Sequence, residues 1–197
     1  MKKTINLSYK RYLLFLFLCL LLVTTKAQVK FGIKAGYNIS NIIYSGPNVI
    51  SRVGPKSNFN AGILSRVPLF NTFMLQAEGV YSGQGADIND SSGHLNYNYI
   101  NIPILFKYQN TSGIFAETGP QFGIKISAKY KSDQYTEDLN DQVKSTDFAW
   151  VFGLGYQISS INIGMDLRYN LGISNFSPYS IYTAKNSVFQ FGAFFIF

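Results

Sequence analysis

The sequence predicts an all-β fold, an eight-stranded antiparallel up-and-down transmembrane β-barrel that follows a cleaved signal peptide. Three observations support this prediction. A basic and then apolar segment opens the chain, eight alternating segments follow it, and the last segment ends on the apolar residue Phe197. Alternation with a period of two is typical of strands with two different faces, and no segment after the opening has the 3.6-residue period of an amphipathic helix.

Residues 1–27 are expected to be a signal peptide. Four basic residues precede the apolar run Leu13–Val23. Its length, about eleven residues, suits a signal peptide and is too short for a helix that spans a bilayer. Small residues at Thr25 and Ala27 predict cleavage after Ala27. The alternative is an uncleaved anchor helix. The chain is therefore expected to divide into a signal peptide, 1–27, and one barrel domain, 28–197.

Removal of this signal would change the charge and the thiol content of the protein. The full chain has 17 Lys and Arg against 10 Asp and Glu. Five of the basic residues lie in the signal, which leaves 12 against 10, so the charge does not predict a nucleic-acid binder. The only cysteine, Cys19, also leaves, and Leu18 before it argues against a lipoprotein signal. The mature chain would contain no disulfide.

The first four expected strands cover residues 29–40 and about 57–67, 72–85 and 95–108. In the first, every odd-numbered residue is apolar and every even-numbered residue is small or polar. The second places Phe59, Ala61, Ile63 and Val67 on one face. The third has its apolar face at odd positions from Phe73 to Tyr81. The fourth has it at even positions from Ile100 to Tyr108.

The last four expected strands cover residues about 114–130, 148–158, 161–171 and 189–197. Apolar residues take the even positions Phe122–Ile126 in the first of these and Phe148–Ile158 in the second. They take the odd positions Ile161–Leu171 in the third and Phe189–Phe197 in the fourth. Pro103 and Pro120 lie inside strand patterns, so each is expected at a bulge or at a local break in pairing.

The connections alternate in length. The second, fourth and sixth are short turns, at 68–71, 109–113 and 159–160, whereas the first, third, fifth and seventh are long and polar. Bacterial outer-membrane barrels have short periplasmic turns and long outer loops, and an even strand number puts both chain ends on one side. The alternative is chance variation in loop length.

The polar faces are expected to point into the barrel. A soluble barrel such as a lipocalin would have the opposite arrangement, and alternation alone does not distinguish the two. However, the polar faces carry many glycines and few charges of mixed sign. A solvated surface would carry more Lys and Glu, whereas the interior of an eight-stranded barrel has little room.

Opposite charges in so narrow a lumen are expected to pair, because an unpaired buried charge is costly. Glu78 and Glu117 are expected to bridge to Arg66, Lys125 or Arg168. The whole predicted lumen charge network is Lys34, Arg66, Glu78, Glu117, Lys125, Asp166 and Arg168. Such a network would fill the lumen and leave no open diffusion pore.

Five segments together resemble the PorT-like outer-membrane β-barrel protein family of Gram-negative bacteria. They are Phe31–Asn38, Tyr99–Lys107, Glu117–Pro120, Phe152–Tyr156 and Arg168–Gly172. The resemblance extends over the whole mature chain and depends on the order and spacing of these segments. It implies an integral outer-membrane barrel inserted by the barrel-assembly machinery, which would recognise Phe197 as an insertion signal. It implies little about activity.

Two polar loops carry residue types that could catalyse a reaction or bind a metal. The only histidine, His94, lies near Asp87, Asp90 and two serines. This could form an acid–base cluster, but a solvated loop is the favoured interpretation, and no enzyme is predicted. Four acids between 133 and 141 could hold a divalent cation, but their spacing matches no calcium loop. No metal and no cofactor are predicted.

The favoured hypothesis is an integral outer-membrane barrel with a plugged lumen and a structural or interaction role through its outer loops. The expected partners are outer-membrane lipid and lipopolysaccharide, with a protein partner at the loops as a further option. A narrow channel or small-solute transporter is the alternative, and a membrane-embedded enzyme centred on His94 is less favoured. The sequence does not identify a ligand or a biological process.

Overall fold

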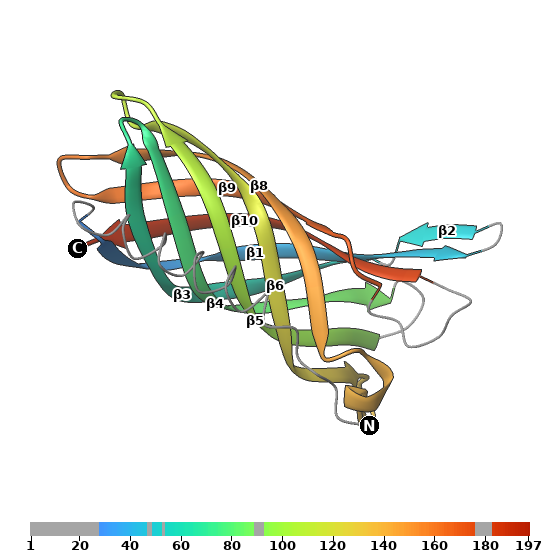
Figure 1. Ribbon diagram of the computed structural model, residues 1–197. Coiled ribbons are helices and arrows are strands. Elements are labelled where there is room, and N and C mark those ends of the chain that lie inside the picture. Colours follow the sequence, from blue (N-terminus) through green and yellow to red (C-terminus); the bar gives the residue numbers. More distant parts are fainter. Residues whose placement is uncertain (1–27, 47–48, 53, 89–92, 176–182) are drawn as a thin grey trace, which may run out of the picture.

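Eight antiparallel strands close into a single barrel in the computed structural model, which describes residues 28–197 except 47–48, 53, 89–92 and 176–182 (Figure 1). Each strand pairs with the next, and the last pairs with the first. The predicted eight-stranded antiparallel barrel is confirmed, whereas the predicted signal peptide, 1–27, lies outside the described residues. The barrel strands are β1 (Lys30–Gly46), β3 (Gly54–Phe70), β4 (Phe73–Ile88), β5 (Gly93–Gln109), β6 (Ile114–Lys131), β8 (Thr146–Ile158), β9 (Ile163–Gly172) and β10 (Thr183–Ile196).

The β1–β10 pairing closes the barrel over almost the full length of both strands. The register runs from Gly32 opposite Ile196 to Ser45 opposite Thr183. The Phe197 N–H donates to the Phe31 carbonyl at 2.8 Å. The C-terminus therefore lies beside the start of β1, at the end of the barrel that also carries the three tight turns (Figure 1). We call this the turn end and the opposite one the hairpin end.

Left-handed backbone conformations form the tight turns. Asn71 has a φ of 45° and Asn162 a φ of 57°, while Gly113 has a φ of 95°. Asparagine and glycine tolerate this region better than other residues. The short connections predicted after the second, fourth and sixth barrel strands are present at these positions.

The hairpin end contains more regular structure than the sequence predicts. β2 (Val49–Arg52) pairs with the end of β1, and β7 (Thr136–Asp138) pairs with the end of β6. A 3₁₀ helix follows at Asn140–Gln142. No helix in the described ranges is long and apolar enough to cross a membrane. Segments expected to be polar loops thus continue as strand pairs.

The third connection was predicted to be long, and this prediction is wrong. β4 continues to Ile88 and β5 begins at Gly93, with Asp87 directly opposite His94. The ladder is formed by backbone groups, which pair whatever the side chains are. An apolar face is needed only where a strand meets lipid or a packed core. For this reason the polar composition of this segment predicts a loop, although β4 and β5 extend into it.

The two faces of the strands have the predicted directions. Apolar residues of the outward face are widely exposed, for example Ile63 at 68% and Phe191 at 58%. Inward residues are buried although many are polar or charged, for example Glu78 and Arg168. A surface band of this composition is stable against lipid and not against water.

Both prolines lie where strand pairing is interrupted. The β4–β5 register passes from Ala77–Ile104 directly to Val80–Asn101, beside Pro103. The β5–β6 register passes from Pro103–Gln121 directly to Phe106–Thr118, opposite Pro120. Proline has no N–H to donate to the ladder, which explains both gaps. The predicted local breaks are confirmed; neither register shifts there.

Candidate functional site in the barrel interior

Four layers of side chains follow one another along the interior from the turn end. The lower apolar cluster is Leu64, Phe115, Phe194 and Ile196. The charged layer above it is Lys34, Glu78, Lys107, Glu117, Asp166 and Arg168. The amide layer is Asn38, Asn60, Ser82 and Gln190. The upper apolar cluster is Ile42, Ala86, Leu95, Tyr97, Tyr99, Ala128, Val143 and Ala184.

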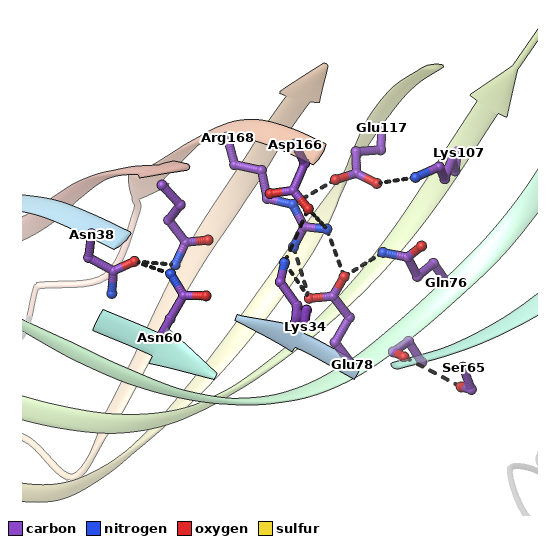
Figure 2. Close-up of polar contacts among 12 residues, drawn as sticks. Lys34, Asn38, Asn60, Ser65, Gln76, Glu78, Lys107, Glu117, Asp166 and Arg168 are labelled. Carbon is purple, nitrogen blue, oxygen red and sulfur yellow. Dashed lines mark hydrogen bonds and ion pairs between the residues drawn. The ribbon is translucent and has the colours of Figure 1, made fainter. Parts of the chain in front are cut away.

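Arg168 is the centre of the charged layer (Figure 2). Its Nε donates to Glu117 Oε1 at 2.6 Å, while Nη1 and Nη2 donate to the two oxygens of Glu78 at 2.8 and 2.7 Å. The guanidinium therefore binds two carboxylates, one of them in a bidentate arrangement. Its planar fork of donors suits this geometry, which a lysine could not reproduce.

Two lysines complete the ion pairs of the charged layer. Lys34 Nζ lies 3.3 Å from Glu78 and 3.5 Å from Asp166. Lys107 Nζ lies 3.3 Å from Glu117 Oε2 and 3.1 Å from the centre of the Phe115 ring. The charged side chains come from β1, β4, β5, β6 and β9, so the layer connects opposite walls of the barrel.

Glycines give the charged layer its space. A Cβ added to Gly153 would lie 2.9 Å from Glu117 Cγ and 3.1 Å from Arg168 Cγ. A Cβ on Gly192 would lie 3.0 Å from an Asp166 oxygen. Inward glycines therefore lie where the large charged side chains cross the lumen, as expected for a narrow barrel.

Amide groups form a second set of contacts above the charges. Asn38 Nδ2 donates to Ser82 Oγ at 2.9 Å and to the Gly83 carbonyl at 2.8 Å. Asn38 Oδ1 accepts from Asn60 Nδ2 at 2.6 Å and from Gln190 Nε2 at 3.0 Å. Asn38 thus joins strands from both sides of the β1–β10 closure.

Five of the seven predicted network residues come together in the charged layer: Lys34, Glu78, Glu117, Asp166 and Arg168. Of the three cations expected to bridge the glutamates, Arg168 does so. Arg66 is buried nearby, but within the described ranges it contacts no carboxylate directly. Its Nε donates to Gln76, its Nη1 donates to Gln157 at 2.7 Å, and its guanidinium carbon lies 4.5 Å from the Phe194 ring centre.

Lys125 requires a correction, because it lies outside the charged layer. Its Nζ donates to the carbonyls of Asn140 and Val143, at the hairpin end. Lys125 is eight residues beyond Glu117 along β6, roughly 26 Å at about 3.3 Å per residue. The alternating sequence pattern predicts that Lys125 points inward. It does not show how far along the barrel axis Lys125 lies from the other charges.

Lys107 is the member of the charged layer that sequence reasoning missed. The sequence does indicate its direction. Phe106 and Tyr108 lie on the apolar face of the strand, so Lys107 between them must point to the opposite, inward face. The lower and upper apolar clusters were also not predicted. Their residues point inward. Most other inward residues are polar, so polar side chains were expected at these positions as well.

His94 and Asp87, which we call the His94 group, lie on the outside of the hairpin end. His94 Nδ1 is 2.8 Å from Asp87 Oδ1, and Lys56 Nζ is 3.9 Å from the same oxygen. Burial lowers the pKa of the Lys56 ammonium, and the Asp87 carboxylate opposes this shift. Asp90, Ser91 and Ser92 lie outside the described residues. In the described part of the chain, no group of three or more His, Cys, Asp or Glu is placed to hold a metal.

Comparison with known proteins agrees with this architecture. The outer membrane protein beta-barrel domain family matches residues 24–177. The crystal structure of Neisserial surface protein A aligns with a TM-score of 0.56 at 11% identity, covering 86% of this chain and 99% of that one. Ail of Yersinia pestis aligns with a TM-score of 0.49 at 16% identity, over 86% and 99% of the two chains. A search of curated proteins gives no match.

Proposed function

This chain belongs to the outer membrane protein beta-barrel domain family and lies in the bacterial outer membrane, and from this premise we propose that it is a closed barrel with a structural or interaction role. In this proposal the barrel wall anchors the protein in lipid, and the hairpin end faces outward and meets a partner. The narrower PorT-like assignment stays a prediction.

The charged layer is the observation that supports a closed lumen. Six charged side chains from five strands contact one another across the interior, and two apolar clusters and the amide layer lie on either side of them. An ion that crosses would have to separate buried pairs, which leaves uncompensated charges in a medium of low dielectric constant. The interior of an eight-stranded barrel is only wide enough for such side chains.

Conductance in planar bilayers tests the closed lumen. The purified protein is expected to show no steady openings. A double variant, Glu78→Ala with Arg168→Ala, removes one anion and one cation from the charged layer together and should also stay closed, because the amide layer and the two apolar clusters still fill the lumen. Steady openings of the unmodified protein would instead support the alternative, a narrow channel or small-solute transporter.

The proposed partners follow from the surface. Outer-membrane lipid and lipopolysaccharide would meet the apolar band, and the barrel-assembly machinery would recognise Phe197 during insertion. Any protein partner would bind at the hairpin end. Crosslinking in intact cells from exposed hairpin-end residues, such as Tyr135 and Lys129, tests this last point. Recovery of only lipid adducts from both positions would count against a protein partner.

No catalytic role is proposed for the His94 group. Asp87 and His94 are direct partners in the β4–β5 ladder. A contact between opposite polar side chains is ordinary for such a cross-strand pair and does not by itself indicate catalysis. Hydrolysis of lipid or peptide substrates by the purified protein that disappears in His94→Ala would refute this part of the proposal.

A further inference from the structure

A polar cavity of about 380 Å³ opens at the turn end, below the lower apolar cluster. The tight turns supply much of its lining, including Asn71, Thr72, Thr111, Ser159 and Asn162. These side chains carry hydroxyl and amide donors. The cavity is separate from the charged layer and was not anticipated from the sequence.

The charged groups that line this cavity are both cations. Lys30 and Arg66 contribute to its wall, and no Asp or Glu among the described residues does. The two lie directly opposite each other in the β1–β3 ladder. Like charges in this position repel each other unless an anion lies between or beside them.

Among the residues that the structure describes, no carboxylate contacts Arg66 directly, although Arg66 is only 3% exposed. Its hydrogen bonds go to two neutral amide oxygens, and its Nη2 has no partner within the described structure. A buried cation normally has an anionic partner, because desolvation of an uncompensated charge is costly. The guanidinium beside this cavity is therefore a second indication that an anion belongs there.

The count of buried charges in the turn-end half of the interior also indicates a bound anion. Its buried cations are Lys34, Arg66, Lys107 and Arg168, and its buried carboxylates in the described chain are Glu78, Glu117 and Asp166. The remaining buried carboxylate, Asp147, lies at the hairpin end and is held by Ser174 and Asn186. One positive charge near the turn end is thus left over.

We propose that the turn-end cavity binds a phosphate group. Lys30 and Arg66 would supply the charge, and the hydroxyl and amide groups of the turns would donate hydrogen bonds to its oxygens. A phosphate offers three strong acceptor oxygens and up to two negative charges, which matches two cations and several neutral donors. The group could come from a lipid headgroup of the inner leaflet or from a free phosphate. The site does not depend on whether the lumen is closed.

Nuclear magnetic resonance of the ¹⁵N-labelled protein in phosphatidylcholine nanodiscs tests this site. Inorganic phosphate, added at constant ionic strength, should produce saturable shifts in the backbone amides of Thr72, Thr111 and Ser159. Lys30→Gln should weaken the apparent affinity about 3-fold to 10-fold. Lys129→Gln, which removes an exposed lysine at the hairpin end, should leave it unchanged. Arg66→Gln should abolish saturation if that variant folds; the test with exposed Lys30 does not depend on it.

The source of the phosphate is distinguished by adding phosphatidylglycerol to the nanodiscs. A headgroup ligand shifts the same turn amides before phosphate is added and weakens the later titration, whereas a free-phosphate ligand leaves both unchanged. The proposal is overturned if neither probe produces saturable shifts at the turn end. It is also overturned if Lys30→Gln and Lys129→Gln weaken binding equally, since the effect would then be general charge attraction.

Discussion

Arg168 shows how a single residue organises the interior. It contacts Glu78 and Glu117 with three nitrogens, and Asp166 lies 3.5 Å from one of them. Such an arrangement contributes little net stability compared with an apolar packing, because burial of every charge has a cost. Removal of one partner is different, since it leaves the remaining charges buried and unpaired.

Arg168→Met should therefore destabilise the barrel by about 3 to 5 kcal/mol, because three carboxylates would lose their shared cation. Urea unfolding of the protein in detergent micelles measures this change. The control is Lys125→Met, which removes the same charge from a half-buried side chain outside the charged layer and should cost less. Equal losses in the two variants would contradict the central position assigned to Arg168.

At the scale of the element, the terminal strand β10 fills part of the interior, faces outward with its other side and closes the barrel. Its inward residues Phe194 and Ile196 belong to the lower apolar cluster, while Phe189, Phe191 and Phe195 point outward, as does Phe197 directly after the strand. It also closes the barrel against β1. The side chain of Phe197 is 68% exposed, so it contributes little to packing within the protein.

If Phe197 is the insertion signal, Phe197→Ala should reduce the amount of folded protein in the outer membrane of cells. Because its side chain packs little within the protein, the same change should cost little stability. The purified and refolded variant should unfold within about 1 kcal/mol of the unmodified protein, as is usual for surface substitutions. Phe191→Ala, which changes an outward phenylalanine within β10, is the matched control. If both variants reach the membrane equally well, Phe197 is not an insertion signal.

At the scale of the whole molecule, the barrel turns its apolar surface outward and its polar groups inward. The exposed apolar residues lie on all eight strands of the barrel. A charge placed in this band should be costly wherever it stands, because the lipid interior offers it no hydration. The same charge at the hairpin end, beyond the band, should have little effect.

Phe191→Lys should thus destabilise the folded barrel by about 2 to 4 kcal/mol in phospholipid bilayers, the range for a lysine near the midplane. Tyr135→Lys makes a similar aromatic-to-lysine change at an exposed position before β7 and should be nearly neutral. Denaturant unfolding in vesicles, followed by tryptophan fluorescence, measures both variants. A neutral Phe191→Lys would mean that this face does not meet lipid.

The sequence by itself determined the strand pattern, the direction of each face and the position of the tight turns. These features depend on local alternation and on turn residues, which can be read along one strand at a time. Local composition was misleading at the hairpin end. There Asp87, His94 and the short strand β7 continue the ladder without an apolar face, and β2 adds a further strand pair to the end of β1.

Only the tertiary structure decided which charges meet. The contacts of Lys34 with Glu78 and Asp166 join residues 44 and 132 positions apart, so their formation depends on the register of every strand between them. Alternation places a side chain inside the barrel, but the register sets its height. For this reason Lys107 joined the charged layer, Lys125 lay far above it, and Arg66 came to face a cavity at the turn end.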